Sequence, residues 1–200
     1  MPRKPAASIQ IEADEEKQPE QVKEKTIHIA YVQAPNLKTN GIPGTIPALL
    51  RDLLLRKAAG WSSPQAIRDA KTRQDRIDIA RFQSIANSDL ELSDAVFADA
   101  EKTKMYIFFY YTAHVSRSPL EGLREWLPTV LGIVPMGQKT RILALVRPNE
   151  KEGDPIGINE TDLPNLGFQG DDDTHVTLDY NANSGTLMGD KAVYAILKRL

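Results

Sequence analysis

The sequence predicts an α+β fold: a single domain in which a mixed or antiparallel sheet with a central aromatic strand packs against several helices. Residues 105–112 read Met-Tyr-Ile-Phe-Phe-Tyr-Tyr-Thr, a run that is apolar on both faces and typical of a strand covered on both sides. Stretches with apolar residues at helical spacing precede and follow it, and other short apolar runs indicate further strands. A length of 200 residues fits one domain.

The first half of the domain is predicted to hold one strand and three helices. The strand alternates its side chains between two faces, and each helix begins at a capping signal such as the Ser-Asp-Leu-Glu capping box at residues 88–91. Gly60 stands where a left-handed residue would end the first helix. The predicted elements are a strand at 26–32 and helices from Thr45 to about Gly60, from Ser63-Pro64 to about Ile85, and from Ser88 to about Lys104.

The second half is predicted to begin with the aromatic strand. A helix follows from the capping box Ser118-Pro119-Leu120-Glu121, and Pro128 is expected to end it early. The apolar run at 140–147 predicts a second buried strand, and the segments 175–180 and 186–188 predict a hairpin. Asp190 is expected to cap the last helix, in which apolar residues recur at helical spacing.

The two flanking regions of high charge are predicted to lie outside the core. Residues 1–25 are basic and then acidic with few apolar positions, so we expect a disordered charged tail. Residues 26–200 form the single globular domain. Within it, residues at about 149–173 are acidic and rich in Gly and Pro, which predicts a long functional or mobile loop.

Composition excludes several functional classes. The absence of cysteine removes thiol catalysis, thiolate metal sites and iron–sulfur clusters. No run approaches the ~18–20 apolar residues of a membrane span, and no apolar signal segment follows the start, so we expect no transmembrane segment and no secretion signal. These features favour the cytoplasm or another reducing intracellular compartment.

Charge is distributed in blocks, which favours self-association. Residues 82–101 sum to −5, residues 102–148 to +5 and residues 149–180 to −8, although the whole chain carries only −2. Acidic and basic faces on one domain can pair between copies. The prediction is a non-enzymatic, self-associating structural or assembly protein, with the general profile of a viral matrix or coat protein and its own copies as partner. The residues expected to make the contact are Glu150, Glu152, Asp171, Asp172, Asp173, Lys139 and Arg141.

A first alternative is binding to nucleic acid or to an anionic membrane surface. The basic regions 51–81 and 102–147 support it, since cations bind phosphate. Within 51–81, however, acidic residues interrupt the basic ones, and no single basic stripe forms on the predicted helix. The candidate contact residues are Arg68, Lys71, Arg73, Arg76, Arg81, Lys139 and Arg141.

A second alternative is a hydrolase with a dispersed site near His175. Asp171, Asp173 and His175 bring carboxylate and imidazole ligands close in sequence, a candidate metal site whose spacing matches no calcium loop. His28 and His114 show no ligand spacing. Residues 132–140 resemble a phosphate-binding loop, but Gln138 is inserted before the lysine and a strand follows, so nucleotide binding is not predicted. We predict no cofactor, and we assign no catalytic residue.

Overall fold

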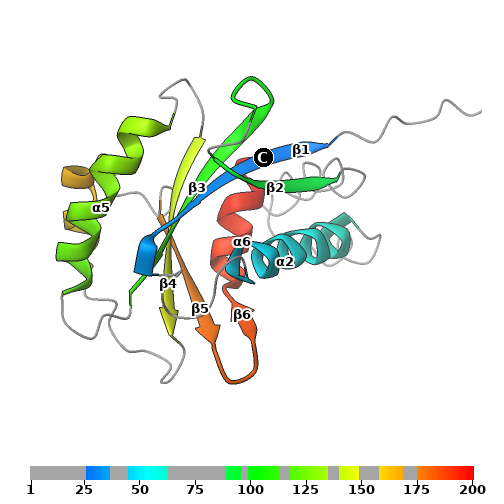
Figure 1. Cartoon of the computed structure of the whole chain (residues 1–200). Helices are drawn as coiled ribbons and strands as arrows, with labels where there is room; N and C mark the ends of the chain where they lie inside the picture. Colours follow the sequence, from blue (N-terminus) through cyan, green and yellow to red (C-terminus); the bar gives the residue numbers. More distant parts are fainter. Residues whose placement is uncertain are drawn as a thin grey trace, which may run out of the picture.

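Six strands form one mixed sheet across the middle of the molecule (Figure 1). The computed structural model describes residues 26–36, 45–62, 89–95, 99–112, 118–134, 140–148, 158–168 and 175–200. From one edge to the other the strands are β2 (Leu90–Asp94), β1 (Ile27–Gln33), β3 (Thr103–Tyr111), β4 (Thr140–Pro148), β5 (His175–Asn181) and β6 (Thr186–Met188). The first five in this order are parallel, and only β6 is antiparallel to its neighbour.

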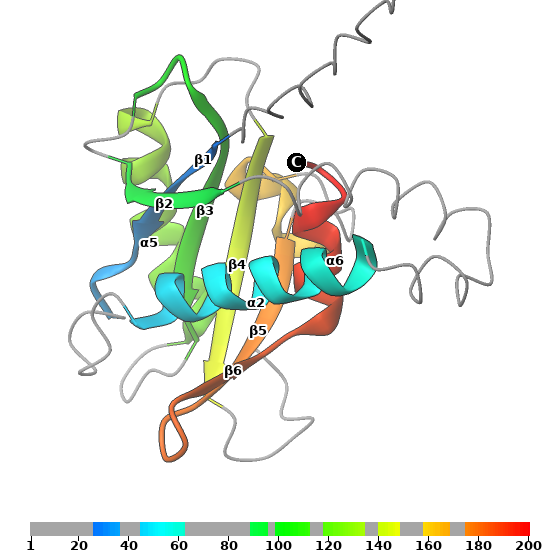
Figure 2. The same ribbon diagram turned by 90° about the vertical axis from the view of Figure 1, so that its right-hand side faces the viewer.

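Helices cover both faces of the sheet. Helices α2 (Thr45–Ser62) and α6 (Asp190–Leu197) pack against one face, and α5 (Pro119–Ile133) packs against the other. Figure 2 shows α2 crossing in front of the sheet with α5 behind it. The described residues therefore form one α+β domain around a mixed sheet. The antiparallel alternative is wrong, because five neighbouring strands run in the same direction.

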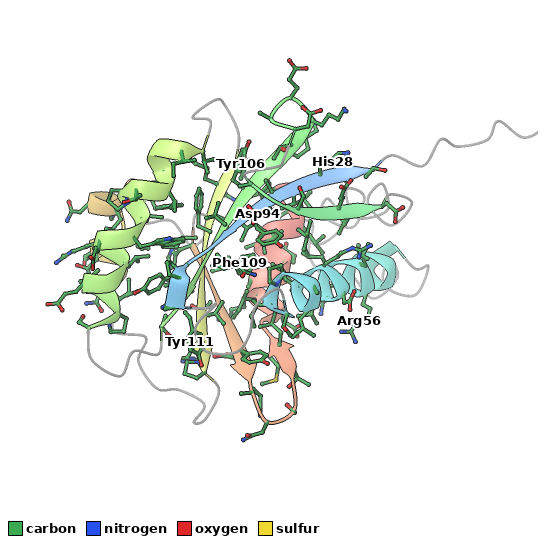
Figure 3. The ribbon with its side chains drawn as sticks, viewed as in Figure 1. His28, Arg56, Asp94, Tyr106, Phe109 and Tyr111 are labelled. Carbon is green, nitrogen blue, oxygen red and sulfur yellow. The ribbon has the colours of Figure 1, made fainter. Side chains whose placement is uncertain are left out.

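Strand β3 contributes to both halves of the core. It lies between β1 and β4, and every side chain from Met105 to Tyr111 is buried. Because side chains alternate along a strand, Phe109 joins the cluster under α2 and α6, and Tyr106 and Phe108 join the cluster under α5. Figure 3 labels Tyr106 and Phe109, which belong to these two clusters. The aromatic run thus supplies apolar surface to two packed layers.

Helix α2 packs through one buried stripe. Ile46, Leu50, Leu54 and Ala58 recur every fourth residue and are almost fully buried, which is the spacing of one helical face. The helix starts at Thr45 as predicted. Its predicted end at Gly60 is wrong by two residues, since the helix runs to Ser62.

Helix α5 begins as predicted but continues through its proline. Ser118 is the N-cap residue and Pro119 is the first helical residue, although within the described residues the Ser118 side chain makes no capping hydrogen bond. Pro128 was expected to end the helix, yet the helix runs to Ile133. Pro128 is exposed, so water can bond the carbonyl that a proline leaves without an amide donor. Leu123 and Leu127 hold the surrounding turns against the sheet.

A strand replaces the helix predicted from the capping box at 88–91. Leu90 pairs with Ile27 in the parallel ladder with β1, and the Ile27 N–H donates to the carbonyl of Asp89 at 2.7 Å. Leu90 is 1% exposed. A ladder that also buries a leucine outweighs a local cap worth about 1 kcal/mol. The helix predicted at 64–85 lies outside the described residues.

The C-terminal segment forms the predicted hairpin and helix. β5 and β6 pair through a turn in which the Asn181 Oδ1 accepts hydrogen bonds from the amides of Asn183 and Ser184. The prediction that Asp190 caps α6 is wrong. Gly189 occupies that position, and Asp190 lies in the first turn, 3.4 Å from the Lys57 Nζ of α2.

Part of the acidic segment is packed into the core. Within 158–168 the chain makes two short 3-10 turns, η1 (Glu160–Asp162) and η2 (Pro164–Leu166). Leu163, Leu166 and Phe168 are buried in the cluster under α5, and the Phe168 ring meets Phe108 edge to face. This apolar triplet anchors a segment that composition alone predicted to be loop.

Candidate functional site

The chain reverses its direction of travel across the sheet between β1 and β3. The connection from β1 includes α2 and leads to β2 at one edge, while the connection from β3 includes α5 and leads to β4 on the other side. The two helices cover opposite faces. In parallel sheets such a reversal leaves a crevice at the carboxyl ends of the two strands, the place where open α/β sheets bind their ligands. Tyr111, labelled in Figure 3, marks this end of β3.

A pocket of about 330 Å³ occupies this position. One wall follows β1, and a second is the end of β3. The third is a stripe of α5, because residues three and four apart share one side of a helix. We call this cavity the switch-point pocket; it is lined by Ala34, Pro35, Asn36, Tyr110, Gly122, Glu125 and Trp126.

Hydrogen bonds hold the strand ends that form the floor of the pocket. The Ala34 amide donates to the Phe109 carbonyl at 2.8 Å, and the Asn36 side-chain amide donates to the Tyr111 carbonyl. The Thr112 amide in turn donates to Val146 on β4 at 2.9 Å. The two backbone bonds extend the ladder beyond the regular strands, and the Asn36 side chain adds a further bond, so the segment after β1 is fixed against the end of β3.

Two aromatic rings form the apolar part of the wall. The centroids of Tyr110 and Trp126 are 5.7 Å apart, with an angle of 33° between the ring planes. Tyr110 is buried and Trp126 is half-buried. The indole therefore packs partly against the core and is partly exposed. Gly122 lies one turn before Trp126 in α5, and both residues line the pocket.

Two described arginines on this side of the sheet belong to ion pairs. On α5, Arg124 Nη2 lies 3.5 Å from Asp162 Oδ1, so this cation is directed toward the η1 turn. On β4, Arg147 Nε lies 2.5 Å from Asp179 Oδ1 of β5. Among the described residues that line the switch-point pocket, Glu125 carries the one carboxylate, and none is a lysine, arginine or histidine.

Most residues of the predicted interfaces lie outside the described part of the chain. This applies to the nucleic-acid candidates of the 63–88 region and to most of the self-association set. The residues concerned are Arg68, Lys71, Arg73, Arg76, Arg81, Lys139, Glu150, Glu152, Asp171, Asp172 and Asp173. The self-association, nucleic-acid and hydrolase hypotheses therefore remain predictions.

Two predicted site residues, Arg141 and His175, are described. They lie near the amino ends of β4 and β5, where Arg141 is level with Tyr106 and His175 is level with Leu143. The switch-point pocket lies at the other end of the parallel strands, where their carboxyl ends meet. The His175 Nδ1 is a buried atom without a hydrogen-bond partner among the described residues. Asp171 and Asp173, its predicted co-ligands, are not described, so the metal hypothesis stays untested.

His28 is a half-buried residue of β1. Its Nδ1 lies 2.9 Å from Glu91 Oε2 on β2, and its side chain is 30% exposed. In the ranges that the structure describes, no three His, Asp or Glu side chains come together as metal ligands. None of the described helices combines the length and apolar character needed to cross a membrane.

No known protein family matches this chain, and none of the curated proteins is significantly similar to it in sequence. The candidate site consequently depends on the geometry of the chain itself. Sequence reasoning missed the switch-point pocket because its residues come from three segments, and none of these contains a recognisable motif. The signal that could have found it is topological: a parallel sheet predicts a site where successive connections diverge.

Proposed function

We propose that this chain is a small-molecule-binding domain whose ligand occupies the switch-point pocket. The supporting observation is a cavity of about 330 Å³ at the carboxyl ends of β1 and β3, where the connections diverge to opposite faces. Ligand pockets begin at about 300 Å³ and combine apolar walls with a few polar groups. The volume suits a compact organic molecule.

The lining supports this proposal. The Tyr110 and Trp126 rings offer flat apolar surface, and Asn36 and Glu125 offer polar atoms on opposite walls. Because the Ala34 amide and the Asn36 side chain both donate hydrogen bonds to backbone carbonyls of β3, the ligand would enter a preformed site. A preformed site avoids much of the entropy loss that ordering a loop would cost.

The test uses Trp126 as the reporter. The sequence contains two tryptophans, so Trp61→Phe leaves Trp126 as the single indole. A fragment library is screened by ligand-observed NMR, and hits are titrated against Trp126 fluorescence. Gly122→Leu should abolish binding, because it adds a large side chain at a position that lines the pocket. Leucine also has a higher helix propensity than glycine, so the variant should stay folded.

Gly132→Leu is the matched control, because Gly132 lies in the same helix with no atom within 4 Å of an added Cβ. It should bind the same fragments as the parent. The proposal is wrong if no fragment changes Trp126 fluorescence, or if Gly122→Leu binds as well as Gly132→Leu.

Self-association is a second proposal, supported by the charge blocks of the sequence. Residues 102–148 sum to +5 and residues 149–180 to −8, so copies of the chain can attract one another. Light scattering at tens of micromolar should then show oligomers at low salt that dissociate as salt screens the charges. A monomer at every salt concentration would contradict it.

A further inference from the structure

We infer that the switch-point pocket selects a flat aromatic ligand, a molecule of one or two fused aromatic or heteroaromatic rings that packs against Trp126. This inference rests on the proposed function and names the ligand class of the same site. The pocket volume of about 330 Å³ lies near the lower end of the range for ligand sites, which suits a molecule of this size.

The indole of Trp126 is the aromatic surface that a ligand can reach most easily. Both Tyr110 and Trp126 line the pocket, but Tyr110 is only 2% exposed, whereas Trp126 is half-buried. An aromatic ligand can stack on a ring with an offset or meet it edge to face, and both geometries are favourable. A ligand in the pocket therefore gains ring contacts mainly from Trp126.

The protein holds this indole in place before a ligand arrives. The centroids of Tyr110 and Trp126 are 5.7 Å apart with 33° between the ring planes, so the two rings pack together. Tyr110 is itself fixed, because β3 pairs with β1 on one side and with β4 on the other. An aromatic side chain has only two rotatable side-chain bonds, so ordering it costs little entropy. The ligand therefore meets a ring whose position is already set.

The segment after β1 adds apolar contacts of fixed shape. Ala34 and Pro35 line the pocket, and the Ala34 amide donates to the Phe109 carbonyl at 2.8 Å. The proline ring also restricts the backbone at position 35. A saturated ring is puckered and carries hydrogens on both faces, so it is thicker than an aromatic ring with the same number of carbons. Because rigid walls tolerate overpacking poorly, they favour the flatter ring.

The test compares aromatic ligands with their saturated counterparts, which keeps the polar group and the absence of charge the same. The pairs are benzyl alcohol with cyclohexylmethanol, and 2-naphthalenemethanol with decahydro-2-naphthalenemethanol. Each compound is titrated with the full chain by ligand-observed NMR. The saturated compounds carry more apolar surface, so burial of apolar area alone would favour them. We expect instead that the aromatic member of each pair binds about 3- to 10-fold more tightly.

Trp126→Leu isolates the contribution of the indole, because leucine keeps an apolar side chain and removes the ring. It should bring the affinities of each pair to within about 2-fold of one another, whereas Trp126→Phe should still favour the aromatic member. Trp61→Leu is the matched control. It makes the same exchange in α2, which packs on the other face of the sheet, and should keep the preference of the parent chain.

The inference is overturned if the saturated compounds bind the parent chain as tightly as the aromatic ones, or if Trp126→Leu keeps the full preference. The outcomes also separate it from the proposed function. If both members of each pair bind equally and Gly122→Leu abolishes that binding, the pocket binds ligands without selecting aromatic rings. If neither these compounds nor the library fragments bind, the proposed function and this inference fail together.

Discussion

The Arg147 Nε lies 2.5 Å from the Asp179 Oδ1 across the neighbouring strands β4 and β5. The two residues are level in the parallel ladder, and their side chains are only 18% and 24% exposed. Water therefore screens this pair less than a surface pair. The contact joins the carboxyl ends of β4 and β5. The switch-point pocket lies at this same end of the parallel strands.

Asp179→Ala should lower the free energy of unfolding by about 2 kcal/mol, because the half-buried Arg147 loses its carboxylate acceptor. Urea denaturation measures the change. The double variant Arg147→Met, Asp179→Leu should lose less than the single variant, since it removes both charges. Lys102→Ala removes the cation of an exposed ion pair with Asp99 and should leave the urea midpoint almost unchanged. An unchanged urea midpoint in Asp179→Ala would show that the Arg147–Asp179 ion pair does not stabilise the fold.

Phe108→Asp should destabilise the domain by several kcal/mol, because Phe108 is 0% exposed and a carboxylate there would lack a polar partner. We expect loss of the folded state or insoluble protein. Lys104→Glu in the same strand is the control; Lys104 is exposed, so the variant should unfold like the parent. A stable, soluble Phe108→Asp chain would show that the packing around β3 differs from that described.

Gly189→Ala should destabilise the domain by about 1–3 kcal/mol through overpacking. A Cβ at position 189 would lie 2.8 Å from the Cδ2 of Leu178 and 3.3 Å from the backbone oxygen of Thr177. Leu178 is fully buried and cannot move aside easily. Gly132→Ala, inside α5 with open space around it, should instead stabilise by roughly 0.5–1 kcal/mol. Thermal unfolding of the pair should therefore shift in opposite directions.

Tyr31 should ionise at higher pH than an ordinary tyrosine. Burial raises its pKa above the usual value of 10.0, and the negative charge of Asp94 raises it further. The neutral phenol is favoured in the folded state, so its contribution to stability is complete below pH 10 and is lost as the pH rises through the folded pKa. Asp94→Asn should lower this pKa in an ultraviolet titration, with Tyr31→Phe identifying the signal. An unchanged titration in Asp94→Asn would refute the role of that carboxylate.

Local sequence patterns predicted most of the elements whose secondary structure does not depend on a distant part of the chain. The strand at 26–32, the buried strand at 140–147 and the hairpin after His175 are confirmed with small shifts at their ends. The period-2 pattern at 26–32, the continuous apolar run at 140–147 and the turn residues of the hairpin sufficed there, because the same residues both prefer the strand and fill the core.

Patterns failed where a distant partner decides the outcome. Leu90 follows a helix-capping signal, but pairing with Ile27 makes it a strand residue. Pro128 is a local helix breaker, but Leu123 and Leu127 keep the helix in place against the sheet. The pocket is the extreme case, because Asn36, Tyr110 and Trp126 become neighbours only when the sheet has formed.

The position of β3 between β1 and β4 has a consequence during synthesis. The ribosome delivers β1 before β3, but β4 follows only after the whole of α5. At about 5–20 residues per second, the aromatic strand then waits for a few seconds with one edge unpaired in the nascent chain. An unpaired strand of this composition readily pairs with other chains. We therefore expect slower elongation through α5 or a shortage of chaperones to lower the soluble yield of this protein, without any change in the stability of the molecules that do fold.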